Sequence, residues 1–140
     1  MLVNLTTNKN SLPGYKTFAE VLSFSREVQD NEATSIVCEN FLCGFSFDDL
    51  PKILNLIVSK MRLKCKLVIS EKDFNLISRY IFREVNDINV INQLVFQDSD
   101  LKIRSILTAE LIESLLEGYN LKLISKGFED LNFSITLERV

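Results

Sequence analysis

Residues 34–73 decide the fold, and they read TSIVCENFLCGFSFDDLPKILNLIVSKMRLKCKLVISEKD. Ser35–Leu42 is mostly apolar and has the length of a buried strand. From Asp48 to Met61 the apolar residues recur every third or fourth position, which predicts one buried face of a helix. Leu63–Ser70 predicts the next strand, and its apolar triplet 67–69 is typical of a strand covered on both faces. Strand, helix and strand in this order predict a parallel βαβ unit.

The ends of the helices carry their own signals. Ser46 or Asp48 suits the N-terminus of the helix at 48–61, because either side chain can accept a free backbone amide there. A second helix is expected over residues 74–85. Asp73 would cap it, or would form an acid–base couple with Glu71, and the cap is the favoured interpretation.

The remaining segments complete an α/β pattern. Leu2–Leu5 is a candidate first strand, 17–24 fits a short strand or a helical turn, and 86–96 a helical stretch. A third firm helix is expected over 108–117, with Gly118 as its left-handed cap. The predicted strands lie near residues 2–5, 35–42, 64–70, 120–126 and 132–140, the last two as an antiparallel hairpin.

Composition limits the possible functions. The chain has 140 residues, 46% of them hydrophobic and 25% charged, which is typical of a single globular domain over residues 1–140. It contains no histidine, so the commonest general base and metal ligand are missing, and we expect no metal site. The three cysteines fit neither a disulfide framework nor a zinc pattern. They predict buried thiols in a reducing compartment, and hence a cytoplasmic protein.

Charge and hydropathy argue against two kinds of partner. The net charge is −3 and the charges are interspersed, which argues against a general nucleic-acid-binding surface. No apolar run has the length of a membrane-spanning helix, and the N-terminus lacks the pattern of a secretory signal. We therefore expect no membrane contact.

The order of elements resembles a class I S-adenosylmethionine (SAM)-dependent methyltransferase over residues 34–140. Such domains often carry a strand, a helix and a strand that begins after L-K-P-G-G, and here the last piece reads RLKCKLVISEKD, residues 62–73. SILTAELIESLLEGY, residues 105–119, resembles the family's threonine-capped helix that ends in a Gly-aromatic pair. The resemblance implies a truncated Rossmann-like, mostly parallel sheet with a C-terminal antiparallel hairpin, and SAM as the cofactor.

The departures from the family pattern suggest a shortened and degenerate member. The glycine-rich cofactor loop after the first strand is replaced by residues 6–10, TTNKN, and the front half is too short for full helices and strands. The strand-four Asp has become Thr34, the first His has become Asn40, and the Pro-Gly-Gly turn has become residues 63–65, LKC. The cofactor is therefore either SAM or none.

Several polar residues are candidates for a cofactor site, while the catalytic residues stay unassigned. Glu39 and Asn40 follow a predicted central strand, where they would contact the adenine or the substrate, or would simply end the strand in water. Glu20 is the candidate for the ribose hydroxyls. Thr6 and Thr7 would bond a ligand or form a surface turn. The complete candidate set is Asn4, Thr6, Thr7, Glu20, Glu39 and Asn40.

Two functional hypotheses follow. In the favoured one the chain is a non-catalytic binding or assembly protein, and in the alternative it is an active small methyltransferase of unknown acceptor. Residues 5–15 discriminate between them, because an open pocket of backbone amides there supports the enzyme and side chains that fill it support the other. The short front half also predicts that one face of the sheet lacks helices. Either segment 8–34 covers this face, or another chain covers it through an apolar patch. We favour the second, and therefore expect a homo-oligomer or a protein partner.

Overall fold

The computed structural model describes residues 1–8, 10–84, 87–96 and 103–140. Within them six strands form one mixed sheet in the order β2-β1-β3-β4-β6-β5. Their bounds are β1 Leu2–Thr6, β2 Lys16–Phe18, β3 Ala33–Glu39, β4 Met61–Lys72, β5 Leu121–Glu129 and β6 Asn132–Arg139. The helices are α1 Val21–Glu27, α2 Leu50–Lys60, α3 Phe74–Glu84, α4 Ile88–Phe96 and α5 Ala109–Leu115, with a short 3₁₀ helix, η1, at Leu42–Gly44.

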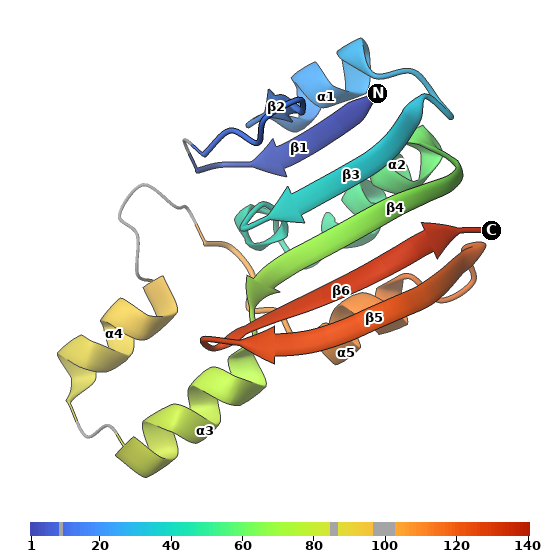
Figure 1. Ribbon diagram of the computed structural model, residues 1–140. Coiled ribbons are helices and arrows are strands. Elements are labelled where there is room, and N and C mark those ends of the chain that lie inside the picture. Colours follow the sequence, from blue (N-terminus) through green and yellow to red (C-terminus); the bar gives the residue numbers. More distant parts are fainter. Residues whose placement is uncertain (9, 85–86, 97–102) are drawn as a thin grey trace.

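The sheet is parallel from β2 to β4 and antiparallel at its C-terminal end. β1 pairs in parallel with both β2 and β3, and β3 pairs in parallel with β4. β6 runs antiparallel between β4 and β5. The expected α/β class, with a mostly parallel sheet and a C-terminal hairpin, is therefore confirmed (Figure 1).

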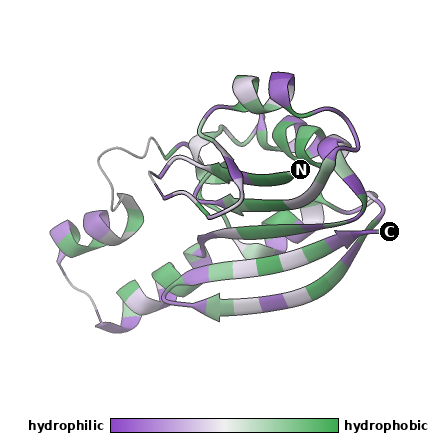
Figure 2. Ribbon diagram, turned by 45° about the horizontal axis from the view of Figure 1, so that its top comes forward, coloured by the Kyte–Doolittle hydropathy of each residue, from purple (hydrophilic) through white to green (hydrophobic). Residues whose placement is uncertain are grey.

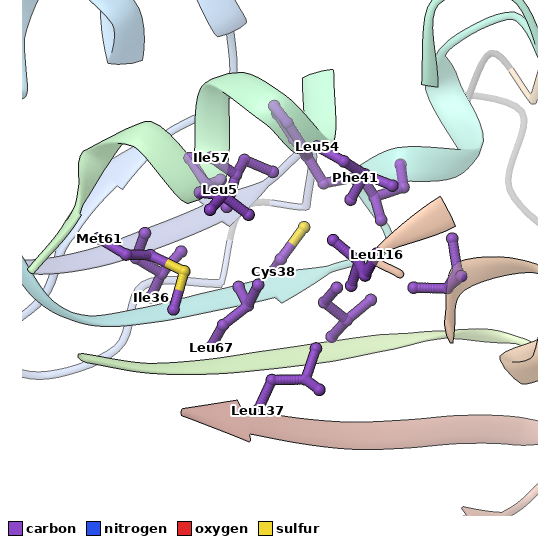
Figure 3. Packing of buried hydrophobic residues seen from close by; sticks show 14 of the residues in the cluster. Leu5, Ile36, Cys38, Phe41, Leu54, Ile57, Met61, Leu67, Leu116 and Leu137 are labelled. Carbon is purple, nitrogen blue, oxygen red and sulfur yellow. The ribbon is translucent and has the colours of Figure 1, made fainter. Parts of the chain in front are cut away.

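One face of the sheet carries the core. Figure 1 shows α1, α2 and α5 behind the sheet, and α3 and α4 extending away from one end of it. Leu54 and Ile57 of α2 pack over the strand side chains, as Figure 3 shows. The fully buried strand residues on this face are Val3, Leu5, Ile36, Cys38, Leu67, Ile69, Phe133 and Ile135. Two of the three free thiols, Cys38 and Cys65, are buried, and Cys43 is partly buried, as the cysteine pattern predicted.

The opposite face has no helix over it within the described residues, as the short front half predicted (Figure 1 and Figure 2). Val37 and Val68 pair in register on this face, and both are partly exposed. The prediction that the apolar triplet 67–69 is covered on both faces is therefore wrong. The expected broad apolar patch is also replaced by mainly polar side chains, which let this face meet water: Ser35, Lys66, Ser70, Ser134, Thr136 and Glu138.

The loop after β1 lies over part of this face. The Asn4 amide donates to the carbonyl of Asn10 at 3.3 Å and to the hydroxyl of Thr17 at 3.2 Å. The hydroxyls of Tyr15 and Ser35 lie 3.2 Å apart. Part of segment 8–34 therefore covers the β1 end of the face, which was one of the two expected ways of covering it.

The front half of the chain is more ordered than its sequence indicated. Residues 17–24 contain both alternatives, because β2 ends at Phe18 and α1 begins at Val21. The rings of Phe18 and Phe24 meet edge to face with centroids 5.8 Å apart, and both side chains are buried. The front half, expected to be too short for full helices, thus contains a helix of two turns, because two aromatic side chains anchor it without a long amphipathic pattern.

The helix ends agree with the sequence in two cases and differ in one. The Asp73 carboxylate accepts the amide of Leu76 at 3.1 Å, so it caps α3 as predicted. Gly118 has φ +89 just beyond α5, also as predicted. Neither Ser46 nor Asp48 caps α2, because its cap residue is Asp49 and the Ser46 hydroxyl donates to the Asp49 carboxylate instead.

Candidate functional site

A cavity of about 440 Å³ lies at the carboxyl end of β3, the position where open α/β sheets bind ligands. Its volume is within the range of small-molecule sites. Glu39 and Asn40 supply one wall, Ser70 of β4 lies between, and the β5–β6 hairpin supplies the other wall. The hairpin residues that border it are Gly127, Phe128, Glu129, Asp130, Asn132, Phe133 and Ser134.

The polar lining of this cavity is acidic and rich in hydrogen-bond acceptors. Glu39, Glu129 and Asp130 contribute carboxylates, and none of the residues that line the cavity is lysine or arginine. The hydroxyls of Ser70 and Ser134 hydrogen-bond to each other at 3.2 Å across the β4–β6 pair. Such a surface favours a ligand that is cationic or rich in donors.

Asn40 joins this cavity to the first strand through its backbone. Its φ is +48, a left-handed conformation that asparagine tolerates better than most residues. Its N–H donates to the carbonyl of Ser70 at 3.0 Å, and its carbonyl accepts the Thr7 hydroxyl at 3.0 Å. The Asn40 backbone is therefore fixed from both sides and ties the ends of β1, β3 and β4 together.

The crevice between β1 and β3 is the switch point of the sheet, because the chain leaves β1 toward β2 on one side and returns to β3 on the other. The Thr7 hydroxyl bridges this crevice to Asn40, and the Thr6 hydroxyl accepts the amide of Asn8 at 3.1 Å. Asn4 and Thr6 are both buried, and their side chains bond to the chain itself. The described polar side chains Asn4, Thr6 and Thr7 of this crevice therefore all make hydrogen bonds within the chain.

The structure brings together only part of the predicted site. Glu39 and Asn40 border the cavity, and Thr7 contacts Asn40 from outside it. Asn4 and Thr6 belong to the packing under the loop after β1. Glu20 is exposed two residues beyond β2, and its side chain makes no capping bond to α1. Glu20 and Glu39 follow strands that lie on opposite sides of β1.

Glu71 is the most unusual ionisable group among the described residues. Its side chain is 1% exposed, and its Oε1 accepts the amides of Phe41 at 2.9 Å and Leu42 at 2.7 Å. Burial raises the pKa of Glu71 to about 7, although the two amides and the Cys43 thiol act in the opposite direction. Burial, together with the nearby Glu71 carboxylate, raises the pKa of the Cys43 thiol to about 12, which makes this thiol a poor nucleophile.

Glu71 and Asp73 do not form an acid–base couple. Both oxygens of Asp73 accept backbone amides, one from Leu76 at 3.1 Å and one from Ala109 at 3.2 Å. Asp73 thereby holds the first turns of α3 and α5, while Glu71 holds the start of η1. Each carboxylate binds the N-terminal amides of a helix, as is common for such groups.

The described residues do not fit a bound SAM at the crevice that the resemblance implies. A cofactor loop offers backbone amides and free polar side chains, whereas here Asn4, Thr6 and Thr7 bond to the chain itself. The buried side-chain atoms left without a hydrogen bond, Glu71 Oε2 and Ser105 Oγ, lie elsewhere. The described residues also contain no group of three acidic or cysteine side chains that could hold a metal ion. No helix formed by them is long and apolar enough to span a membrane.

Comparisons with known proteins identify the fold. No protein-family model matches the sequence, and no curated protein matches it. Among solved structures, a SAM-dependent methyltransferase from Archaeoglobus fulgidus has a TM-score of 0.60 at 12% identity, over 97% of this chain and 75% of that one. One from Methanosarcina mazei has a TM-score of 0.62 at 14% identity, over 95% of this chain and 71% of that one.

A third similar structure is the magnesium protoporphyrin IX methyltransferase from Synechocystis PCC 6803 with bound SAH. Its TM-score is 0.58 at 9% identity, over 90% of this chain and 51% of that one, so this chain spans about half its length. The chain therefore has the fold of class I SAM-dependent methyltransferases, as the resemblance over residues 34–140 implied. At these identities the likeness concerns the fold alone.

Proposed function

We propose that this chain is a degenerate methyltransferase-like domain that acts by binding or assembly rather than by methyl transfer. The observation that carries the proposal is that threonine side chains at the crevice bond to the chain itself: the Thr7 hydroxyl donates to the Asn40 carbonyl, and the Thr6 hydroxyl accepts the Asn8 amide. Methyl transfer depends on a cofactor held in alignment with its acceptor. Side chains that already bond to the chain are not free to hold such a cofactor. We expect the protein in the cytoplasm, where its three thiols stay reduced.

The alternative function is an active small methyltransferase of unknown acceptor. The cavity of about 440 Å³ beside Glu39 and Asn40 favours it, because its acidic lining suits the positively charged sulfonium of SAM. In this alternative the cofactor would occupy the cavity next to β4 rather than the crevice next to β1.

Titration of the protein with S-adenosylhomocysteine in a calorimeter separates the two functions. We expect no saturable heat, because the side chains of Asn4, Thr6 and Thr7 at the crevice already bond to the chain itself. Saturable binding in the micromolar range would overturn the proposal. Two matched variants then locate the site: Glu39→Gln weakens binding if the cavity holds the ligand, and Glu20→Gln weakens it if the crevice does.

The assembly part of the proposal rests on the helices that extend from the sheet. Phe82 on α3 is 91% exposed, Ile88 at the start of α4 is 65% exposed, and Tyr80 of α3 is 41% exposed. Large apolar side chains that remain exposed favour an interaction surface. We propose that the surface of α3 and α4 that carries Phe82 and Ile88 joins two copies of the chain or binds a protein partner. It replaces the sheet face as the expected interface.

Light scattering over a wide concentration range measures this assembly. We expect a mass that rises toward a dimer, and a monomer for Phe82→Ser. Phe47→Ser is the matched control, because Phe47 is also exposed, at 61%, but lies before α2. A wild-type monomer at every concentration contradicts self-association and leaves a protein partner as the ligand of this surface. Equal masses for the two variants contradict the assignment to α3 and α4.

A further inference from the structure

A second and smaller cavity lies where β4 ends, on the face of the sheet that carries the core. Its volume is about 40 Å³, enough for one or two groups of the size of a water molecule. The walls are mainly apolar and come from α3, α4 and residues 103–107, through Phe74, Ile77, Val95, Ile106 and Leu107. Ile106 is half-exposed, so the apolar wall continues to the surface.

Two buried polar atoms in this lining have no hydrogen-bond partner within the described residues. Glu71 Oε2 accepts no hydrogen bond from an N–H or O–H of these residues, although Oε1 of the same carboxylate accepts two and the Cys43 thiol, a weak donor, lies beside the carboxylate. Ser105 Oγ makes no hydrogen bond to a described residue, and Ser105 is only 8% exposed. Leaving a buried polar group unpaired is costly, and the cost is higher for a charged one. Both atoms belong to residues that line the same cavity.

The backbone holds these two residues in place. The carbonyl of Cys43 accepts the amides of Arg104 at 2.8 Å and Ser105 at 3.2 Å, which fastens these two residues to η1. Glu71 fastens η1 to β4 through its two amide bonds. The carboxylate and the hydroxyl are therefore parts of one rigid frame rather than of a mobile surface, which is the arrangement that a specific site needs.

We propose that this cavity binds a primary ammonium group carried on a short apolar chain. The ammonium would donate to Glu71 Oε2 and Ser105 Oγ inside the cavity, and the chain that carries it would leave the cavity along Ile106 toward the surface. An ammonium has three donors and a positive charge, so it satisfies both atoms and neutralises the buried carboxylate. An alcohol would satisfy the same atoms without the charge. Lys72 also lines the cavity and would favour an anion, so a carboxylate ligand is the competing chemistry.

This inference does not depend on the proposed function. The small cavity shares only Asn40 with the cavity beside the hairpin, and none of its lining comes from the crevice after β1. A binding protein and an active methyltransferase could each contain it, and its test uses no SAM or S-adenosylhomocysteine.

Calorimetric titration of the intact protein with hexylamine, hexanol and hexanoate at pH 8 tests the proposal. We expect hexylamine to bind saturably, hexanol to bind about tenfold more weakly, and hexanoate not to bind. NMR spectra should show hexylamine shifting the amide signals of Leu42 and Ser105, which border the site. Glu71→Gln should weaken the binding of hexylamine by about tenfold and leave the affinity for hexanol unchanged, because the substitution removes the charge of the side chain and keeps its shape.

Two further variants keep the test decisive. Ser105→Ala should also weaken the binding of hexylamine, and it replaces Glu71→Gln in the test if that variant does not fold. Glu117→Gln is the control and should leave the binding of hexylamine unchanged, because Glu117 is exposed beyond α5. The proposal is overturned if hexylamine does not bind, if hexanoate binds more tightly, or if Glu71→Gln binds hexylamine as the wild type does. A single ordered water between Glu71 and Ser105, detected by NMR with no amine binding, would overturn it as well.

Discussion

Leu67→Ala and Ile69→Ala are each expected to lower the free energy of unfolding by about 2–5 kcal/mol. Both side chains are fully buried on the core face of β4, the strand that joins the parallel and antiparallel parts of the sheet. Leu67 lies between Ile36 and Leu137 in register, so its removal leaves a cavity that neighbours on two strands must fill. Chemical denaturation followed by circular dichroism measures the change.

Val68→Ala is the matched control on the same strand. Val68 belongs to the helix-free face and is partly exposed, so its truncation is expected to cost less than about 1 kcal/mol. A loss below about 1 kcal/mol for Leu67 or Ile69 would contradict the placement of β4 at the centre of the core. A loss of several kcal/mol for Val68 would show that another chain covers the second face.

The strands could be predicted where their patterns are local. Alternation from Phe133 to Leu137 predicts β6, and it reports one buried face correctly. The apolar triplet 67–69 predicts β4, but the expectation that both faces of this strand are covered was wrong. Val68 pairs with Val37 and Thr136 on the open face, and a single valine between two buried residues is tolerated at a half-exposed position.

The front half was underestimated because its order comes from contacts rather than from periodicity. The short strand β2 has three residues and α1 has seven, too few for a repeating pattern. Phe18 and Phe24 pack edge to face, and Lys16 pairs with Glu27 at 2.5 Å between the two elements. Such pairs are visible only after the chain is folded.

Only the part of the candidate site that follows a local strand pattern could be predicted from the sequence. Glu39 and Asn40 follow a recognisable strand, and the carboxyl end of a parallel strand faces the ligand edge of the sheet. The hairpin residues that complete the cavity were missed, because the register that sets Ser134 opposite Ser70 joins positions 64 residues apart. Sequence alone predicts a hairpin there but not the strand with which it pairs.

Glu71 gives the protein a pH dependence that its sequence did not reveal. The carboxyl group has a pKa near 4.5 in an unfolded chain and of about 7 in the folded protein, where burial disfavours its charged form. Between these pH values the folded state keeps a proton that the unfolded state loses, so unfolding releases a proton and stability falls as pH rises. The full loss amounts to about 3 kcal/mol and is complete just above pH 7.

Glu71→Gln isolates this effect. Glutamine keeps an oxygen that accepts the amides of Phe41 and Leu42 but has no proton to lose. Denaturation at a series of pH values should therefore show the stability of the variant, relative to the wild type, rising by about 3 kcal/mol from pH 4.5 to just above 7. Three charged or titratable groups face Glu71, namely Cys38, Cys43 and Lys72. They are unchanged in the variant, so their influence cancels in this difference.

The control variant Glu117→Gln should give a difference that does not change over this range, because Glu117 is exposed at the end of α5. A flat difference for Glu71→Gln would mean that the folded carboxylate ionises as readily as the unfolded one. A difference that falls with pH would mean that the two amides and a further partner stabilise its charged form. Either result would also remove the unsatisfied buried charge on which the ammonium site depends, so this measurement on the free protein comes before the ligand titrations.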